Sequence, residues 1–179
     1  MADEKWFLNV GQIVEQLGVK PNMAIADFGA GHGFFSIAFA KKVGHSGQVF
    51  AVDILQSALD AIKSQAKLEG FFNIKLVKGN LEKAGGSALA DESCDMVFIA
   101  NLMFQAPNKT GLIDEARRVL KKGGELAIVE WKPYIELGPR KENRLSEEEL
   151  KQLVAPEGFA ELKSINAGSH HYGLVFIKN

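Results

Sequence analysis

The 179-residue sequence has a single cysteine and a formal net charge of only −1. One cysteine excludes an internal disulfide and a cysteine-rich metal site, so we expect Cys94 to be an inert thiol and no metal to be bound. Charges of one sign never gather into a long run, which argues against an extended nucleic-acid-binding surface. We therefore expect no nucleic acid among the partners.

Long apolar runs are also missing. No stretch approaches the roughly 18 apolar residues of a membrane-spanning helix, and the acidic opening Met1–Lys5 is not followed by the apolar segment of a signal peptide. We expect a cytoplasmic protein with no membrane span. Hydrophobic residues, 46% of the total, are spread along the chain. This distribution predicts one globular domain over residues 1–179.

The sequence is rich in apolar runs that alternate with helical patterns. The runs that predict strands are residues 24–28, 48–53, 74–78, 95–100 and 124–131. Such near-continuous apolar strands are covered on both faces, as in a parallel sheet. The helix before the last of them should include Leu112 to Leu120 and end at the pair Gly123-Gly124. A repeated strand–helix alternation is typical of the α/β class.

The C-terminal part has a different pattern. Ser146 followed by Glu149 is a capping box, which predicts the start of a helix. Two strand-like runs come after it, at 159–165 and 172–178, and the connection between them is too short for a parallel crossover. We therefore expect an antiparallel hairpin to complete an otherwise parallel sheet.

The most informative segment spans residues 24–36. A buried strand ends in an acid, Asp27, and is followed by Gly29, Gly31 and Gly33 and then by the start of a helix. Alternate glycines let the backbone turn sharply and approach a ligand closely. The start of a helix offers free N–H groups and a positive dipole end to an anion. The segment therefore predicts a binding site for a ligand with a negative group.

Two kinds of cofactor could occupy such a turn. In the dinucleotide motif G-x-G-x-x-G the third glycine would stand where this chain has Phe34, and Asp27 would repel a pyrophosphate. An acid beside the turn instead suits a ligand that carries both an ammonium and a carboxylate. Asp27 can receive the ammonium while N–H groups of the turn take the carboxylate. This favours S-adenosylmethionine, with an NAD-dependent oxidoreductase as the alternative.

The chain here resembles the class I S-adenosylmethionine-dependent methyltransferases. The segments that carry the resemblance are 26–33, 49–53, 78–81, 94–101 and 120–126. Residues 130–133 and 144–146 add a likeness to small bacterial and archaeal proteins similar to the ubiquinone/menaquinone C-methyltransferase group. The resemblance implies a Rossmann-like, doubly wound, seven-stranded and mostly parallel sheet. Its implied order is 3-2-1-4-5-7-6, with helices on both faces.

Polar residues follow several predicted strands, at the sheet edge where ligands of such folds bind. Asp53 could accept both ribose hydroxyls, or cap the next helix. Asn80 stands where the family usually has an acid near the adenine amino group, and it could instead be a turn residue, as could Asn101. The predicted cofactor-binding residues are Asp27, Gly29, Ala30, Gly31, Gly33, Asp53, Ile54, Asn80, Leu81 and Asn101.

Methyl transfer is a displacement at a carbon that the cofactor already activates, so the protein mainly aligns and desolvates the reactants. No nucleophile or metal is required, and no catalytic residue is assigned. The residues that could accept a proton are His32, Glu130, Tyr134, His170 and His171. The acceptor pocket should be formed by residues 6–8, 103–104 and 132–144.

The sequence thus predicts an S-adenosylmethionine-dependent methyltransferase. We expect it to act on a small-molecule acceptor as a monomer or homodimer. The alternatives are a protein that binds S-adenosylmethionine without transferring the methyl group and a nucleic-acid methyltransferase. The near-neutral charge and the sequence Asn101-Leu-Met-Phe104 after the fourth strand argue against the second.

Overall fold

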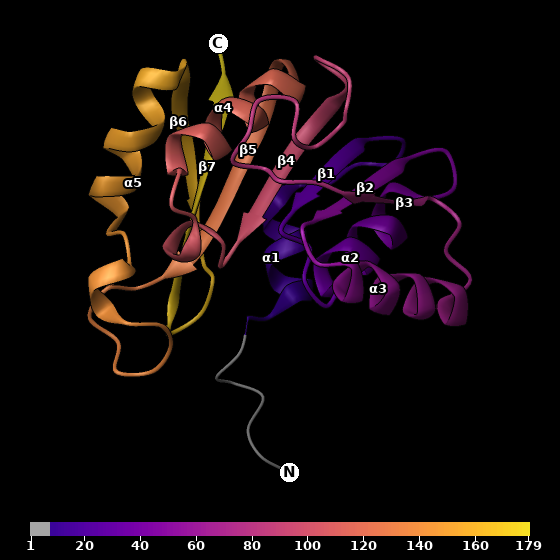
Figure 1. Cartoon of the computed structure of the whole chain (residues 1–179), viewed down its shortest axis with the longest axis horizontal. Coiled ribbons are helices and arrows are strands. Elements are labelled where there is room, and N and C mark those ends of the chain that lie inside the picture. Colours follow the sequence, from indigo (N-terminus) through magenta and orange to yellow (C-terminus); the bar gives the residue numbers. More distant parts are fainter. Residues whose placement is uncertain (1–7) are drawn as a thin grey trace.

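A computed structural model of the chain describes residues 8–179, which build a twisted sheet of seven strands covered by helices (Figure 1). The strands are β1 (Ala24–Phe28), β2 (Gln48–Asp53), β3 (Ile74–Lys78), β4 (Cys94–Ala100), β5 (Leu120–Trp131), β6 (Phe159–Ile165) and β7 (His171–Lys178). Their order is β3-β2-β1-β4-β5-β7-β6. Strands β1 to β5 pair in parallel, and β7 pairs antiparallel with both β5 and β6. The predicted fold class is confirmed, including the C-terminal hairpin.

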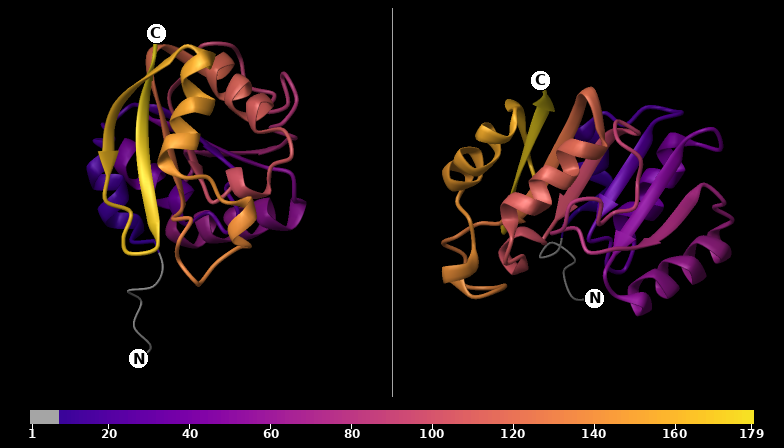
Figure 2. Two further views of the ribbon diagram at one scale, coloured as in Figure 1. Left: turned by 90° about the vertical axis from the view of Figure 1, so that its left-hand side faces the viewer. Right: turned by 45° about the horizontal axis from the view of Figure 1, so that its top comes forward.

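Helices cover both faces of this sheet (Figure 2). They are α1 (Val10–Leu17), α2 (Phe34–Val43), α3 (Gln56–Glu69), α4 (Lys109–Val119) and α5 (Glu147–Val154). Apolar residues of α1 and α2 form one core with one face of the sheet, and those of α4 and α5 form a second core with the opposite face. Within the described residues, no helix is long and apolar enough to cross a membrane.

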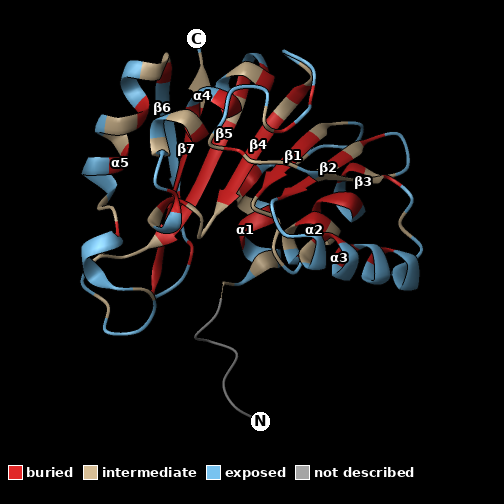
Figure 3. Cartoon of the chain, in the orientation of Figure 1, coloured by how far each residue is buried: buried red, intermediate tan, exposed pale blue. Residues whose placement is uncertain are grey.

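The central strands supply both cores. Successive residues of a strand point to opposite faces, so Ile25 belongs to the core with α1 and α2, whereas Ala26 belongs to the core with α4 and α5. Figure 3 shows the result, because the middle of the sheet is buried along almost its whole length. This double coverage explains why the strands read as continuous apolar runs rather than as alternating patterns.

Strand β5 begins earlier than the sequence indicates. Helix α4 ends at Val119, and Leu120 already has extended backbone and pairs with Cys94, so Leu120 was wrongly included in the helix. The glycine pair lies inside the strand, where Gly123 has φ +74° and the register shifts irregularly between Cys94 and Met96 of the partner strand. A glycine at positive φ fits a bulge as well as a helix end. The glycine pair does mark a special backbone conformation, but the prediction that it ends the helix was wrong.

The start of α5 is as predicted. The Ser146 hydroxyl oxygen accepts a hydrogen bond from the Glu149 N–H at 3.2 Å, and Glu149 Oε2 accepts from the Ser146 N–H at 2.8 Å. Both halves of the capping box are therefore present, and they satisfy two N–H groups at the helix start. The hairpin also agrees with the prediction, except that β7 begins at His171, one residue earlier.

Candidate functional site

A cavity of about 330 Å³ opens at the carboxyl ends of β1, β2 and β3, and we call it the strand-end pocket. Its volume lies at the lower end of the roughly 300–1,000 Å³ typical of small-molecule sites. Its lining residues are Gly29, Gly31, Asp53, Ile54, Leu55, Gly79, Asn80, Leu81, Glu82, Leu102, Gln105, Ala106 and Leu112. The fold thus brings together six of the residues that the sequence indicates: Gly29, Gly31, Asp53, Ile54, Asn80 and Leu81.

The turn after β1 leaves one side of its backbone open. Gly31 has φ +53°, and a Cβ added there would meet nothing closer than a carbonyl oxygen at 3.9 Å. By contrast, a Cβ at Gly33 would lie 2.5 Å from a side-chain carbon of Ile62 on α3. Gly33 is therefore needed for packing between the turn and α3, whereas Gly31 is needed for its backbone conformation and leaves free space beside the pocket.

The N–H groups of this turn already have partners within the protein. Gly29 and Ala30 donate to a carbonyl oxygen of β2 at 2.8 and 3.1 Å, Gly33 donates back to Ala30 at 2.8 Å, and Gly31 donates to Asp53 Oδ2 at 2.9 Å. This differs from the expectation that these groups would take a ligand carboxylate. The N–H groups in the first turn of α2 have no acceptor within the helix. That of Ser36 is bound to Asp27, so those of Phe34 and Phe35 are the donors that follow the turn most directly.

Asp53 connects the turn after β1 to the loop after β2. It is 8% exposed; Oδ2 accepts from Gly31 and Oδ1 accepts from the Leu55 N–H at 2.9 Å. It does not cap α3, because Leu55 occupies the N-cap position and no side chain caps that helix. A carboxylate has about four acceptor sites, so two remain for hydroxyl groups of a ligand in the pocket that Asp53 lines.

Asp27 is buried beside the same turn. It is 3% exposed, and Oδ2 accepts a hydrogen bond from the Ser36 hydroxyl at 2.5 Å. Burial raises the pKa of Asp27 to about 7; the Ser36 hydrogen bond opposes this rise and the nearby charge of Asp53 adds to it. Near neutral pH this carboxyl is therefore only partly ionised, and a cation placed beside it would favour the ionised form.

The two asparagines occupy different places. Asn80 lines the strand-end pocket, and its Oδ1 accepts from the Glu82 N–H at 3.0 Å, which is the turn role considered as the alternative. Asn101 follows β4 at φ +54° and lines a second, neighbouring cavity. Its buried Oδ1 has no hydrogen-bond partner among the described residues. Unpaired buried polar atoms are rare and costly, so this atom calls for an explanation.

The second cavity, of about 660 Å³, lies near the carboxyl ends of β4 and β5, and we call it the aromatic pocket. Its lining residues are Leu8, Asn9, Val10, Phe34, Phe35, Asn101, Trp131 and His171. Of the predicted acceptor-pocket residues that the structure describes, only Leu8 lines it. Met103 is fully buried in the core, and residues 132–144 are not part of the lining, although Gly138 and Arg144 lie beside Trp131. The predicted Trp6 and Phe7 lie outside the described residues. Phe34 and Phe35 directly follow the glycine turn, a sequence signal that could have pointed to them.

Glu130, a candidate base, has a structural role. It is 2% exposed, and its Oε1 accepts from the N–H groups of Leu102 and Met103 at 2.8 and 2.7 Å. Burial raises its pKa to about 7, while these two hydrogen bonds oppose the rise. Glu130 thereby holds the loop after β4 that separates the two pockets. Two other candidates, His32 and Tyr134, are exposed.

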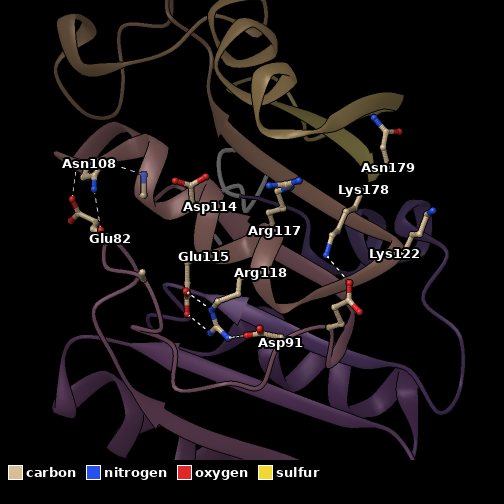
Figure 4. Close-up of a pocket in the computed structure, with 13 residues that line it drawn as sticks. Glu82, Asp91, Asn108, Asp114, Glu115, Arg117, Arg118, Lys122, Lys178 and Asn179 are labelled. Carbon is tan, nitrogen blue, oxygen red and sulfur yellow. Dashed lines mark hydrogen bonds and ion pairs between the residues drawn. The ribbon is translucent and has the colours of Figure 1, made fainter.

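A larger cavity of about 920 Å³ lies beside α4 and is lined mainly by charged residues (Figure 4). Its central groups bind one another. Arg118 pairs with the buried Glu115 at 2.7 Å and with Asp91 at 2.5 Å, and Glu115 also accepts from the N–H groups of Gly85 and Ser87. This network ties the loop before β4 to α4. We therefore read the cavity as structural, despite its size.

The strand order, with acids at the ends of β1 and β2 and a glycine turn between them, defines the Rossmann-like methyltransferase class. Residues 19–169 match the model of a family described as a methyltransferase domain. The chain therefore belongs to the methyltransferase domain family, as the resemblance in its motifs indicated. Among the described residues, no group of three or more His, Cys, Asp or Glu side chains is placed to hold a metal ion.

Similar proteins are found by sequence and by structure. The ubiquinone/menaquinone biosynthesis C-methyltransferases UbiE of Hydrogenovibrio crunogenus and Shewanella pealeana are 31% and 32% identical, over 66% and 69% of this chain. The aligned parts are 46% and 49% of those proteins, so the chain spans about half the length of these relatives.

Solved structures agree on the fold. A SAM-dependent methyltransferase from Aquifex aeolicus superposes with a TM-score of 0.88 at 24% identity, covering 97% of this chain and 91% of that one. The 1,6-didemethyltoxoflavin-N1-methyltransferase of Burkholderia thailandensis, solved with its substrate and S-adenosylhomocysteine, has a TM-score of 0.71 at 19% identity, covering 95% and 76%. At these identities the likeness shows a shared fold.

Proposed function

We propose that this protein transfers a methyl group from S-adenosylmethionine to a small-molecule acceptor. The observation that carries the proposal is the strand-end pocket, which Gly31 and Asp53 both line and in which the Asp53 carboxylate accepts from the Gly31 N–H. This carboxylate suits the cofactor, because its free acceptor sites can take hydrogen bonds from the two ribose hydroxyls. The apolar side chains of Ile54 and Leu81, which also line the pocket, suit the adenine ring.

The residues would act on the cofactor by binding and orientation. Asp53 would hold the ribose, Asp27 would neutralise the ammonium of the methionine part, and the first turn of α2 would receive its carboxylate. When bound, S-adenosylmethionine supplies a methyl group on a positively charged sulfur. The acceptor's electron pair forms the new bond to the methyl carbon as the carbon–sulfur bond breaks, and that bond's electrons stay on sulfur. An acceptor that carries a proton loses it to water.

Calorimetric titration with S-adenosylhomocysteine tests the cofactor assignment directly. We expect one molecule to bind per chain, in the micromolar range or tighter, whereas NADH should bind far more weakly under the same conditions. Absence of measurable heat with correctly folded protein at high micromolar ligand would contradict the proposal. A labelled-methyl assay against a panel of small molecules then separates a transferase from a protein that only binds the cofactor.

Binding should also release protons near neutral pH. The ligand ammonium favours ionised Asp27, whose pKa in the free protein is about 7, so about half a proton should leave at pH 7 and more at lower pH. Affinity should therefore fall as pH drops below about 7. Calorimetry in buffers of different ionisation enthalpy measures the released protons.

Two substitutions identify the group that releases the proton. In Asp27→Asn the dependence on buffer should disappear. Glu130→Gln is the matched control, because Glu130 is a second buried carboxyl with a pKa of about 7 and glutamine keeps an oxygen for the loop after β4. This control should retain the proton release. Release that persists in Asp27→Asn would show that the ammonium lies elsewhere.

Several finer expectations stay predictions from the sequence. They are the organisation of residues 1–179 as one domain, the cytoplasmic location and the monomeric or homodimeric state. We propose them alongside the function, and sedimentation analysis of the purified chain would decide the last.

A further inference from the structure

The aromatic pocket has walls suited to a flat molecule. The rings of Trp131 and His171 pack directly against each other, with centroids 4.1 Å apart and planes tilted by 45°, and Phe35 packs against Phe98 of the core at 4.4 Å. Phe34, at the start of α2, is 71% exposed beside the cavity. Aromatic side chains pack well against the faces and edges of other rings. A flat ring in this pocket would therefore find rigid partners and would cover apolar surface that now faces solvent.

The electrostatic environment behind this wall is positive. Arg144 is only 6% exposed, and its guanidinium carbon lies 5.9 Å from the centre of the Trp131 ring. Its side chain donates five hydrogen bonds, all to carbonyl oxygens of the segment between Lys132 and Pro139. Within residues 8–179, no carboxylate forms an ion pair with it. The exposed carboxylate of Glu136 interacts with Arg144 only beyond ion-pair distance, so the buried guanidinium still disfavours a second cation nearby.

The residues that line the aromatic pocket also disfavour a cationic ligand. No acidic side chain occurs among the described residues that form it. A protonated amine would therefore find no carboxylate there, whereas a neutral or anionic group would meet no opposing charge. Both the wall and the lining argue against an aliphatic ammonium as the acceptor.

Two polar atoms of the pocket's residues lack partners. His171 is 4% exposed, and its Nε2, like Asn101 Oδ1, is buried without a hydrogen-bond partner among the described residues. Burial lowers the pKa of His171 to about 4, and electrostatic interactions with the neighbouring His170, Lys132 and Arg144 side chains lower it further. The imidazole is therefore neutral at physiological pH. A ligand with a polar edge could form hydrogen bonds with both atoms, which would offset the free energy lost by leaving them unpaired.

We propose that the aromatic pocket is the methyl-acceptor subsite and that it takes a flat conjugated ring, neutral or anionic, whose polar edge hydrogen-bonds to His171 and Asn101. The inference rests on the proposed function. Its second support is position: Asn101 lines the aromatic pocket, and the next residue, Leu102, lines the strand-end pocket. Adjacent residues of the loop after β4 thus line the two cavities.

The test uses the indole of Trp131 as the reporter. The chain has two tryptophans, and comparison with the spectrum of Trp131→Phe assigns the indole N–H signal of Trp131 in a proton–nitrogen NMR spectrum of the wild type. Naphthol, naphthoate and naphthylmethylammonium present the same ring as a neutral molecule, an anion and a cation. We expect the first two to shift the Trp131 signal and to bind at least about tenfold more tightly than the cation.

A histidine substitution tests the polar edge. His171→Phe keeps a ring of similar shape but removes Nε2, so naphthol affinity should fall about tenfold. His45→Phe, on an exposed loop, is the matched control and should leave it unchanged. If His171→Phe does not fold, His171→Gln, which retains a hydrogen-bonding group, should bind naphthol more tightly than His171→Ala. Equal binding of all three naphthalenes, or no shift of the Trp131 signal at their solubility limits, would overturn the proposal.

The same sample separates this inference from the proposed function. If S-adenosylhomocysteine binds and none of the three rings does, the subsite is wrong and the methyltransferase assignment stands. If the rings bind with the expected charge preference and S-adenosylhomocysteine does not, the ring-binding pocket stands and the proposed function fails.

Discussion

Asp53→Ala is expected to weaken S-adenosylhomocysteine binding by about 100-fold or more. The ribose hydroxyls would lose two charge-assisted hydrogen bonds, each contributing roughly 1.5–3 kcal/mol. The substitution also removes the acceptor of the Gly31 and Leu55 N–H groups, so the turn after β1 and the loop after β2 lose their connection. Both effects act in the same direction, and the loss should be larger than for any other residue of the strand-end pocket.

Two further variants separate these effects. Asp53→Asn keeps one oxygen for the backbone but loses the charge, so we expect intermediate affinity with little change in thermal stability. Asp60→Ala removes the same kind of side chain from the exposed face of α3 and should bind like the wild type. The measurement is calorimetric titration at one pH, with melting curves recorded for each variant. Wild-type affinity in Asp53→Ala would show that the ribose assignment is wrong.

Arg118→Ala should lower the free energy of unfolding by about 3–5 kcal/mol, the usual result of leaving a buried charge unpaired. Its partner Glu115 has a fully buried side chain. Burial alone would raise the pKa of Glu115, but hydrogen bonds from Arg118, Ser87 and Gly85 hold it near 2. Without the guanidinium the carboxylate keeps only neutral donors. The loop before β4 would also lose its bonds to α4 through Leu89 and Asp91.

Urea unfolding at neutral pH measures this effect. Arg117→Ala, one position earlier and exposed, is the matched control and should change stability by less than about 1 kcal/mol. The pH dependence provides a second readout. Because the pKa of Glu115 is lowered in the folded state, its contribution is present above about pH 4.5 and is lost as pH falls toward 2. In Arg118→Ala this acid-dependent loss should be smaller, because the pKa of Glu115 in the folded state moves back up toward its ordinary value. A change below 1 kcal/mol would mean that the network is not stabilising.

Much of the fold could be predicted from local patterns. Strands covered on both faces have a distinctive apolar sequence, and residues at the ends of parallel strands, such as Asp27 and Asp53, must meet at one edge. The strand order itself came from the resemblance rather than from any residue pattern. The glycines of β5 show the limit of this reasoning. Positive φ at Gly123 serves a bulge here, and a local sequence cannot distinguish a bulge from a helix end.

The aromatic pocket shows why part of the site could not be predicted. Trp131 and His171 are distant in sequence and meet because β5 and β7 pair in a register that places them opposite one another. Nothing local to either residue encodes that register. The partners of the turn's N–H groups were similarly hidden, because the carbonyl that accepts from Gly29 belongs to Val52 on the neighbouring strand.

The loop after β4 has a fixed position between the residues that line the two pockets. A single oxygen of Glu130 accepts from the N–H groups of Leu102 and Met103, and the adjacent residues Asn101 and Leu102 line the two pockets. If the two reactants bind as proposed, the distance between them depends on the buried Glu130 carboxylate that positions this loop. It does not depend on the side chains that line the rest of the aromatic pocket. Residues such as Leu8, Phe34 and His171 could then vary during evolution and change which acceptor is chosen, while the distance over which the methyl group travels stays the same.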